Sequence, residues 1–163
     1  MSKATDYSVV KVKFFRGHDG DGFNATLLCN GKAVATVDDD GWGGGLSFNW
    51  IGVRPNEVGD DQKAFDAMID ALPLDMTSDL FPDGFKLDGD CFVEPLVTRF
   101  DNVRRMKRKL KSTVMFAKPE GGVYNYSKCK PTYENIKWVG KKHPNCTILN
   151  ELPEEEAYKL FYA

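Results

Sequence analysis

Residues Phe14–Trp50 read FFRGHDGDGFNATLLCNGKAVATVDDDGWGGGLSFNW. At the centre of this stretch, Asn30-Gly31 separates two runs of strand-forming residues, 23–29 and 32–37. Asn-Gly is the strongest short-range hairpin signal, because both residues tolerate the positive φ angles of a type I′ turn. The stretch therefore predicts a β-hairpin centred on Asn30-Gly31.

Two acidic, glycine-rich loops flank this hairpin, at residues 18–22 and 38–45. Oxygen-rich clusters suit Mg²⁺ or Ca²⁺. However, the Asp-x-Asp-Gly of residues 19–22 lacks the downstream glutamate of a calcium loop, and Asp and Gly are also the commonest turn residues. We interpret the loops as turns and exposed acidic surface. The alternative is a metal-dependent enzyme that uses Asp19, Asp21 and Asp38–Asp40.

Alternating patterns on both sides extend the hairpin into a sheet. Apolar residues of Ser8–Phe15 are interleaved with Lys11 and Lys13, and Leu46–Trp50 alternates cleanly. Four strands joined by short loops predict an antiparallel β-meander. A second hairpin is predicted in the C-terminal half, with arms at 113–118 and 123–129, and a short strand at 147–149.

About four helices are expected to pack with these strands, over 60–72, 92–111, 133–143 and 153–161. The first has an apolar stripe that includes Phe65 and Ile69 and ends before Pro73. For the third, the pattern around Ile136 and Trp138 suits a strand as well as a helix, and we choose the helix. The apolar stripe of the second is Leu96, Phe100, Val103, Met106 and Leu110. The fold class is therefore α+β, in one domain over residues 1–163.

Composition narrows the class of protein. Hydrophobic residues make up 42% and charged residues 28% of the 163, which is typical of a globular protein rather than a disordered one. The four cysteines form no CxxC pair, so a disulfide framework or zinc site is not favoured. The chain has neither a run of eighteen apolar residues nor a signal-peptide pattern. We expect a cytoplasmic protein that has no membrane partner.

The net charge of −2 hides a strong asymmetry along the chain. Residues 1–98 carry 8 Lys and Arg against 17 Asp and Glu, whereas residues 99–142 carry 13 against 3, and residues 143–163 carry 1 against 4. Such asymmetry predicts a face for a polyanion or an acidic partner. The alternative is that the two halves pack together and neutralise each other.

The basic block is the clearest electrostatic feature. Four aromatic residues, Tyr124, Tyr126, Tyr133 and Trp138, lie among its cations and could stack on nucleic-acid bases. A solvated helix face is the alternative interpretation. The candidate nucleic-acid-binding residues are Arg104, Arg105, Arg108, Lys109, Lys111, Lys141 and Lys142.

A separate set of residues is a candidate for protein binding. Trp42 lies among glycines, so it either packs back on the sheet or projects as a binding hot spot. Residues 73–90 form an acidic connection rich in Pro, Asp and Gly, which suits a partner-binding loop. The candidate residues are Asp38, Asp39, Asp40, Trp42, Asp79, Phe81, Asp83 and Phe85.

Catalytic motifs are not found. Neither His18 nor His143 accompanies a recognisable serine or cysteine nucleophile, and no phosphate-binding loop or zinc-finger spacing occurs. A restriction-type nuclease would require paired acidic residues and a lysine near a strand, and Glu134 with Lys137 matches this pattern only weakly. We predict no catalytic residues, no metal site and no cofactor.

Several segments resemble small accessory proteins of bacteriophages and mobile elements. They are Gly17–Gly20, Phe23–Leu27, Asn30–Ala35, Asp39–Gly44 and Arg105–Lys109. The resemblance implies a protein that binds and blocks a host factor. Because no catalytic motif is found, we predict a non-enzymatic anti-defence or host-takeover inhibitor that binds a host macromolecule. The expected partner is a host protein or nucleoprotein complex in the host cytoplasm, and direct nucleic-acid binding is the alternative.

Overall fold

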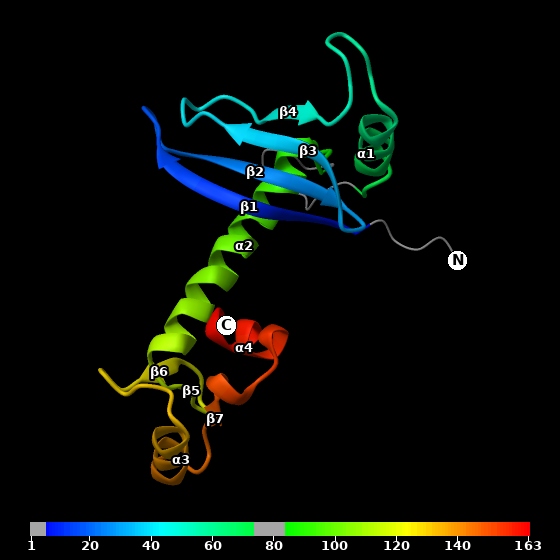
Figure 1. Cartoon of the computed structure of the whole chain (residues 1–163). Coiled ribbons are helices and arrows are strands. Elements are labelled where there is room, and N and C mark those ends of the chain that lie inside the picture. The colour runs from blue at the N-terminus through cyan, green and yellow to red at the C-terminus, as the bar shows by residue number, and fades with distance from the viewer. Residues whose placement is uncertain (1–5, 74–83) are drawn as a thin grey trace. The chain divides into compact units, whose positions relative to one another are not determined.

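The computed structural model describes residues 6–73 and 84–163 (Figure 1). The chain divides into two compact units, which we call unit 1 (Met1–Phe100) and unit 2 (Asp101–Ala163). The predicted α+β class, with an N-terminal antiparallel meander, helices and a second small sheet, is confirmed. The expectation of one domain stays a prediction, and each unit is described by itself.

Unit 1 is built on a four-stranded antiparallel sheet in the order β1-β2-β3-β4. The strands are β1 (Tyr7–Arg16), β2 (Asp21–Cys29), β3 (Lys32–Asp39) and β4 (Ser47–Trp50). The turn between β2 and β3 has φ angles of 49° at Asn30 and 81° at Gly31. Both are positive, as the Asn-Gly signal predicts.

A β-bulge interrupts the alternation of β1. The pairing with β2 shifts between Val10 and Lys13, and Lys11 has a φ angle of 55°. Because the bulge adds one residue, Val9 and Val12 are both buried although they are three positions apart, a spacing that would place them on opposite faces of a regular strand. Simple alternation therefore does not describe this strand beyond Val10.

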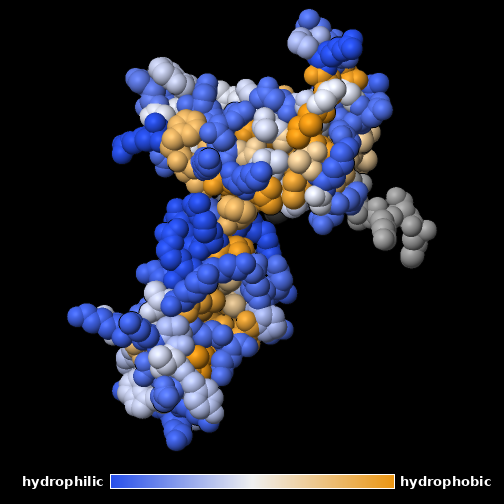
Figure 2. Space-filling view, viewed as in Figure 1, coloured by the Kyte–Doolittle hydropathy of each residue, from blue (hydrophilic) through white to orange (hydrophobic). Residues whose placement is uncertain are grey.

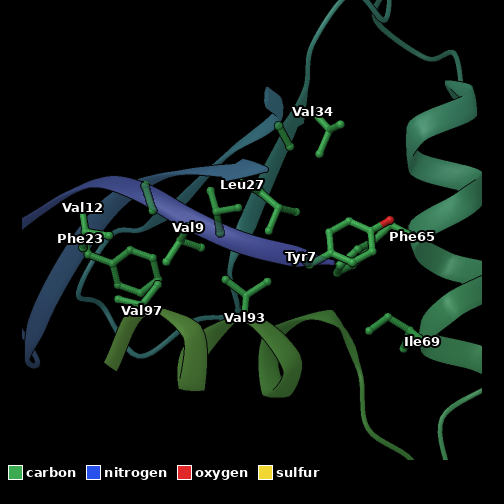
Figure 3. Close-up of a cluster of buried hydrophobic side chains, with 13 residues drawn as sticks. Tyr7, Val9, Val12, Phe23, Leu27, Val34, Phe65, Ile69, Val93 and Val97 are labelled. Atoms are coloured by element: carbon green, nitrogen blue, oxygen red, sulfur yellow. The ribbon is translucent and has the colours of Figure 1, made fainter. Parts of the chain in front are cut away.

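The core of unit 1 lies between this sheet and two helices, α1 (Asp60–Asp70) and the first half of α2 (Gly89–Ser112). In Figure 3, Val93 and Val97 of α2 point toward the strands, and Phe65 and Ile69 approach from α1. These valines are buried more completely than Leu96 and Phe100 of the predicted stripe, which pack at the edge of the cluster.

Tyr7 joins the sheet to both helices. Its ring meets Phe65 edge-on at 5.2 Å and Phe92 at 5.9 Å, and the residue is only 7% exposed. This burial, with smaller contributions from Cys29 and Asp61, raises the pKa of Tyr7 to about 12. The phenol is therefore neutral in the folded protein at ordinary pH.

Helix α2 begins at Gly89, three residues before the predicted start. Asp88 caps it, because the carboxylate Oδ1 accepts a 2.8 Å hydrogen bond from the backbone N–H of Cys91. The same hydrogen bond holds the pKa of Asp88 below its usual range. Asp88 lies two helical turns before Leu96, the first residue of the predicted apolar stripe, so the stripe does not indicate that the helix begins there.

Unit 2 is built on a small sheet in the order β6-β5-β7. Its strands are β5 (Met115–Ala117), β6 (Val123–Asn125) and β7 (Thr147–Ile148), all shorter than predicted, and its other elements are α3 (Tyr133–Lys142), the 3-10 turn η1 (Leu149–Glu151) and α4 (Glu154–Phe161). All three residues of β5 are buried. Phe116 joins one cluster with Val114 and Val139, whereas Met115 and Ala117 join another with Leu149.

The segment that suited either a helix or a strand is the helix α3. Thr132 caps its N-terminus, because the hydroxyl accepts a 3.3 Å hydrogen bond from the backbone N–H of Asn135. Val139 is fully buried in the core, whereas the adjacent Trp138 is 48% exposed.

The side chain of Asn150 connects three elements of unit 2. Its Nδ2 donates to the carbonyl oxygens of Leu110 (2.8 Å) and Thr113 (3.0 Å) at the end of α2. Its Oδ1 accepts from the backbone N–H of Met115 (2.7 Å) at the start of β5. One amide thus satisfies backbone groups that a helix end and a strand start leave unpaired.

We predict that Asn150→Asp destabilises unit 2, because a carboxylate keeps the acceptor but removes both donated hydrogen bonds. Each buried group left without a partner costs roughly 1–3 kcal/mol. Thermal unfolding followed by circular dichroism measures the loss. Asn125→Asp, at an exposed position of β6, makes the same charge change and serves as the control. Equal melting temperatures for the two variants would contradict the role assigned to Asn150.

Candidate functional site

The two glycine-rich loops of unit 1 pack directly against each other. The backbone N–H of Asp19 donates to the carbonyl of Gly41 at 2.9 Å. A Cβ atom on Gly17 would lie 2.6 Å from the Cα of Gly41, closer than side chains permit. The glycines are therefore needed for the close approach of the two backbones, as well as for turning the chain.

The aspartates of the second loop hold its turns. The Oδ1 of Asp39 accepts from the backbone N–H of Gly41 at 2.8 Å, and that of Asp40 accepts from Trp42 at 2.9 Å. Asp38 accepts from the side-chain amides of Asn24 and Asn49 on the neighbouring strands. Within residues 6–73 and 84–163, no group of three or more His, Cys, Asp or Glu side chains is placed to hold a metal ion.

Trp42 projects from these loops instead of packing on the sheet. It is 62% exposed, and its ring stacks on His18 with a centroid distance of 4.7 Å and an interplanar angle of 8°. His18 in turn contacts Asp19 at 2.9 Å between Nδ1 and Oδ1. We call Trp42 and His18, with the loops that carry them, the loop surface.

The remaining protein-binding candidates come from the acidic connection that precedes α2 in the sequence. Asp79, Phe81 and Asp83 lie outside the described residues, and Phe85 is half-buried before α2. A separate cavity of about 730 Å³ lies beside β4, lined by this strand, residues 53–57, α1 and the start of α2. Asp90, which lines this cavity, accepts a 2.9 Å hydrogen bond from the backbone N–H of Leu46. Its carboxylate therefore holds the chain that follows the glycine-rich loop of residues 38–45.

The division of charge along the chain follows the boundary between the two units. Unit 1 carries 9 Lys and Arg against 17 Asp and Glu, a net charge of −8, whereas unit 2 carries 13 against 7, a net charge of +6. Hydrophilic side chains cover most of the face of unit 2 that Figure 2 shows. The basic character therefore belongs to one structural unit.

Three cations of α2 already have partners. Arg104 and Arg105 contact the carboxylate of Asp101 at 2.7 and 2.6 Å. Asp101 is only 8% exposed, so both guanidinium groups neutralise a buried charge. Lys107 pairs with Glu154 of α4. These three residues therefore stabilise unit 2 in addition to contributing positive charge.

The remaining cations of the predicted set differ in their surroundings. Arg108, Lys109, Lys111 and Lys141 are exposed, and none has a carboxylate partner among the described residues. The ammonium of Lys142 lies over two aromatic rings instead. The first four are the cations of the predicted set that are available to an anionic ligand.

Aromatic residues and lysines gather at β6 and the C-terminal end of α3, forming what we call the aromatic surface. The Nζ of Lys142 lies 4.8 Å from the ring of Trp138, and that of Lys118 lies 4.5 Å from the ring of Tyr124. The hydroxyl of Tyr126 is 2.7 Å from Nε2 of His143. The members of this surface are Lys118, Tyr124, Tyr126, Trp138, Lys142 and His143.

Sequence reasoning noted the aromatic residues here but missed Lys118 and His143 as parts of a site. A usable signal was present for Lys118, because strand alternation places it on the side of Phe116. The spacing of Trp138 and Lys142 at i and i+4 likewise places them together on a helix. His143 gave no comparable signal, because its partner Tyr126 is distant in sequence.

No protein-family model matches the chain, and neither a curated protein nor a solved structure is significantly similar to it. In the described part of the chain, no helix is both long and apolar enough to cross a bilayer. The interpretation of the two surfaces therefore depends on their own chemistry.

We predict that reversing both Arg104 and Arg105 to Glu destabilises unit 2, because buried Asp101 would then face two like charges. The loss should be on the order of 1–2 kcal/mol, below the about 3–5 kcal/mol of a fully buried pair, because both guanidinium groups are solvent-screened. Reversing Arg108 and Lys109 makes the same charge change without this cost. Chemical denaturation of the two variants measures the difference, and equal stabilities would contradict the role of Asp101.

Proposed function

We propose that the protein is a non-enzymatic binding protein whose unit 2 contacts nucleic acid, either directly or within a nucleoprotein complex. The observation that carries the proposal is a combination found on one unit of net charge +6: cations that have no carboxylate partner among the described residues, and an exposed aromatic surface. Cations supply contacts to phosphates, and aromatic rings supply contacts to bases.

The acidic unit 1 supports an oriented mode of binding. Its net charge of −8 repels a polyanion, whereas the net charge of +6 on unit 2 attracts one. The small net charge of the whole chain limits long-range attraction, so affinity must come from contacts at unit 2. Binding should therefore be sensitive to substitutions in unit 2 and insensitive to those in unit 1.

The test is a gel-shift series with single- and double-stranded DNA and RNA. Because each neutralised phosphate releases condensed counterions, six contacts would cost about a thousandfold in affinity between about 50 and 200 mM salt. Reversing Arg108, Lys109 and Lys111 to Glu should abolish binding at low salt. Reversing Lys32, Lys63 and Lys86 of unit 1 makes the same charge change and should leave binding intact.

Two results would contradict the proposal. One is the absence of any shift at low salt with all four nucleic acids. The other is a shift that changes with neither salt nor the reversal in unit 2. In both cases the cations of α2 would have only a structural or protein-binding role.

The second candidate function is inhibition of a host protein through the loop surface, as the resemblance to phage accessory proteins implies. A specific observation favours it: Trp42 is 62% exposed yet fixed by its stack on His18. Large, rigid aromatic side chains of this kind dominate the binding energy of many interfaces. In this second candidate function the loop surface inhibits the host protein, while nucleic-acid contact remains assigned to unit 2.

For this second candidate we predict that Trp42→Ala releases a protein partner captured from bacterial lysate, because truncating a hot-spot residue costs about 2 kcal/mol or more of binding energy. Tyr133→Ala, at a 68% exposed aromatic position in unit 2, is the matched control and should retain the partner. Quantitative pull-down with both variants makes the comparison. Recovery that is equal for wild type and Trp42→Ala would rule out the loop surface.

A further inference from the structure

We infer that the aromatic surface of unit 2 is a site for single-stranded nucleic acid. Bases stack on the exposed rings of Tyr124 and Trp138, and a backbone phosphate occupies the adjoining cavity. This inference rests on the proposed function and deepens it, because it names the form of nucleic acid and the residues that select it.

The two rings are exposed and held in place. Tyr124 is 44% and Trp138 is 48% exposed. Tyr124 lies 6.0 Å from Phe116, which is buried, and Trp138 meets Tyr126 edge-on at 5.2 Å. In a duplex the faces of the bases are covered by their neighbours, so only unpaired bases can stack on such rings. The rings therefore favour a single strand.

A cavity of about 260 Å³ lies between the residues after β5 and the end of α3, and the two lysines that lie over these rings line it. A water molecule takes up about 30 Å³ in the liquid, so the cavity has room for a phosphate group with some of its hydration. Lys118, Lys142 and His143 all line it. Glu120 lines it as well, 3.8 Å from Lys118, but its side chain is 69% exposed and its charge is therefore screened by solvent.

The ring of His143 is fixed at the wall of this cavity. It stacks on Phe116 with a centroid distance of 4.5 Å and an interplanar angle of 18°. The hydroxyl of Tyr126 lies 2.7 Å from its Nε2. Because these contacts orient the imidazole before any ligand arrives, it loses little side-chain freedom on binding.

The two lysines connect the cavity to the rings. In the unbound protein Lys118 lies over Tyr124 and Lys142 over Trp138. An exposed cation–π contact strengthens an interaction by a factor of about two to five. A stacked base contributes about fivefold to a hundredfold. An arriving base therefore displaces the ammonium group from the ring, and the ammonium moves to the phosphate, where its hydrogen bonds are charge-assisted.

The experiment measures fluorescence anisotropy of the full-length protein with labelled oligothymidylate of about 15 nucleotides, within the usual range of single-strand sites. A duplex of the same length is the comparison. Trp138→Leu and Tyr124→Leu are the test variants, and Trp42→Leu, the exposed tryptophan of unit 1, is the matched control. Circular dichroism of each variant confirms that it is folded.

We expect tighter binding of the single strand than of the duplex. Each test variant should weaken single-strand affinity by roughly tenfold, which corresponds to the loss of one stacked base. The salt dependence should stay unchanged in these variants, because stacking releases no counterions. Replacing Lys118 and Lys142 with Gln should instead lower the slope of log affinity against log salt by about 0.7 for each cation.

Several results would overturn the inference. If single strand and duplex bind equally and both leucine variants bind like wild type, the aromatic surface is not the site. In that case the proposed function stands only if reversing Arg108, Lys109 and Lys111 still abolishes binding. If no nucleic acid binds but an acidic peptide such as oligoglutamate does, both the inference and the proposed function fail.

Discussion

The structure of unit 2 depends on one side-chain amide. Asn150 accepts a hydrogen bond from the first residue of β5 and donates two to the end of α2. Strand β5 has only three residues, and both small cores of the unit form around it. Because side chains alternate between the two faces of a strand, a displacement of β5 by one residue would exchange the side chains that enter the two cores. The amide fixes where the helix ends and where the strand begins, and so fixes which side chains enter each core.

The position of the aromatic surface follows from this register. With Phe116 on the side of α3, strand alternation places Lys118 on the same side, and Tyr124 pairs with Phe116 from β6. The end of α3 then contributes Trp138 and Lys142 at a spacing of one helical turn. Buried Asp101 has a similar role on α2, since it engages Arg104 and Arg105 and leaves Arg108 and Lys109 for other partners. The available cations are therefore determined by internal pairing as much as by sequence position.

Local signals in the sequence predicted most of the elements. The Asn30-Gly31 turn, the apolar stripes and the loop glycines depend on neighbouring residues, so the meander, the helices and the second sheet could be derived from them. The bulge at Lys11 could not, because it depends on pairing between strands. Arg104 and Arg105 follow Asp101 at i+3 and i+4 on α2, a spacing that the sequence shows, but the burial of Asp101 depends on tertiary packing and could not be derived. The fixed stack of His18 on Trp42 required the two loops to be placed together, and the contact of Tyr126 with His143 joins distant segments. Sequence therefore identified the basic block, but not which of its cations are occupied.

The charge balance bears on which kind of contact dominates. The whole chain has a net charge of −2. At physiological salt, the interaction between exposed charges is screened beyond a distance of about 8–10 Å. A protein of this kind gains little from general attraction to a polyanion and must depend on short-range contacts. An exposed cation–π contact is worth about 0.5–1 kcal/mol, whereas stacking a base is worth about 1–3 kcal/mol. The rings of the aromatic surface therefore have more to gain from a base than from the lysines that cover them, and the lysines lose little by moving to a phosphate. Because of this exchange, the aromatic surface is hydrophilic when no ligand is bound. It binds only a ligand that presents a flat base and an anion together.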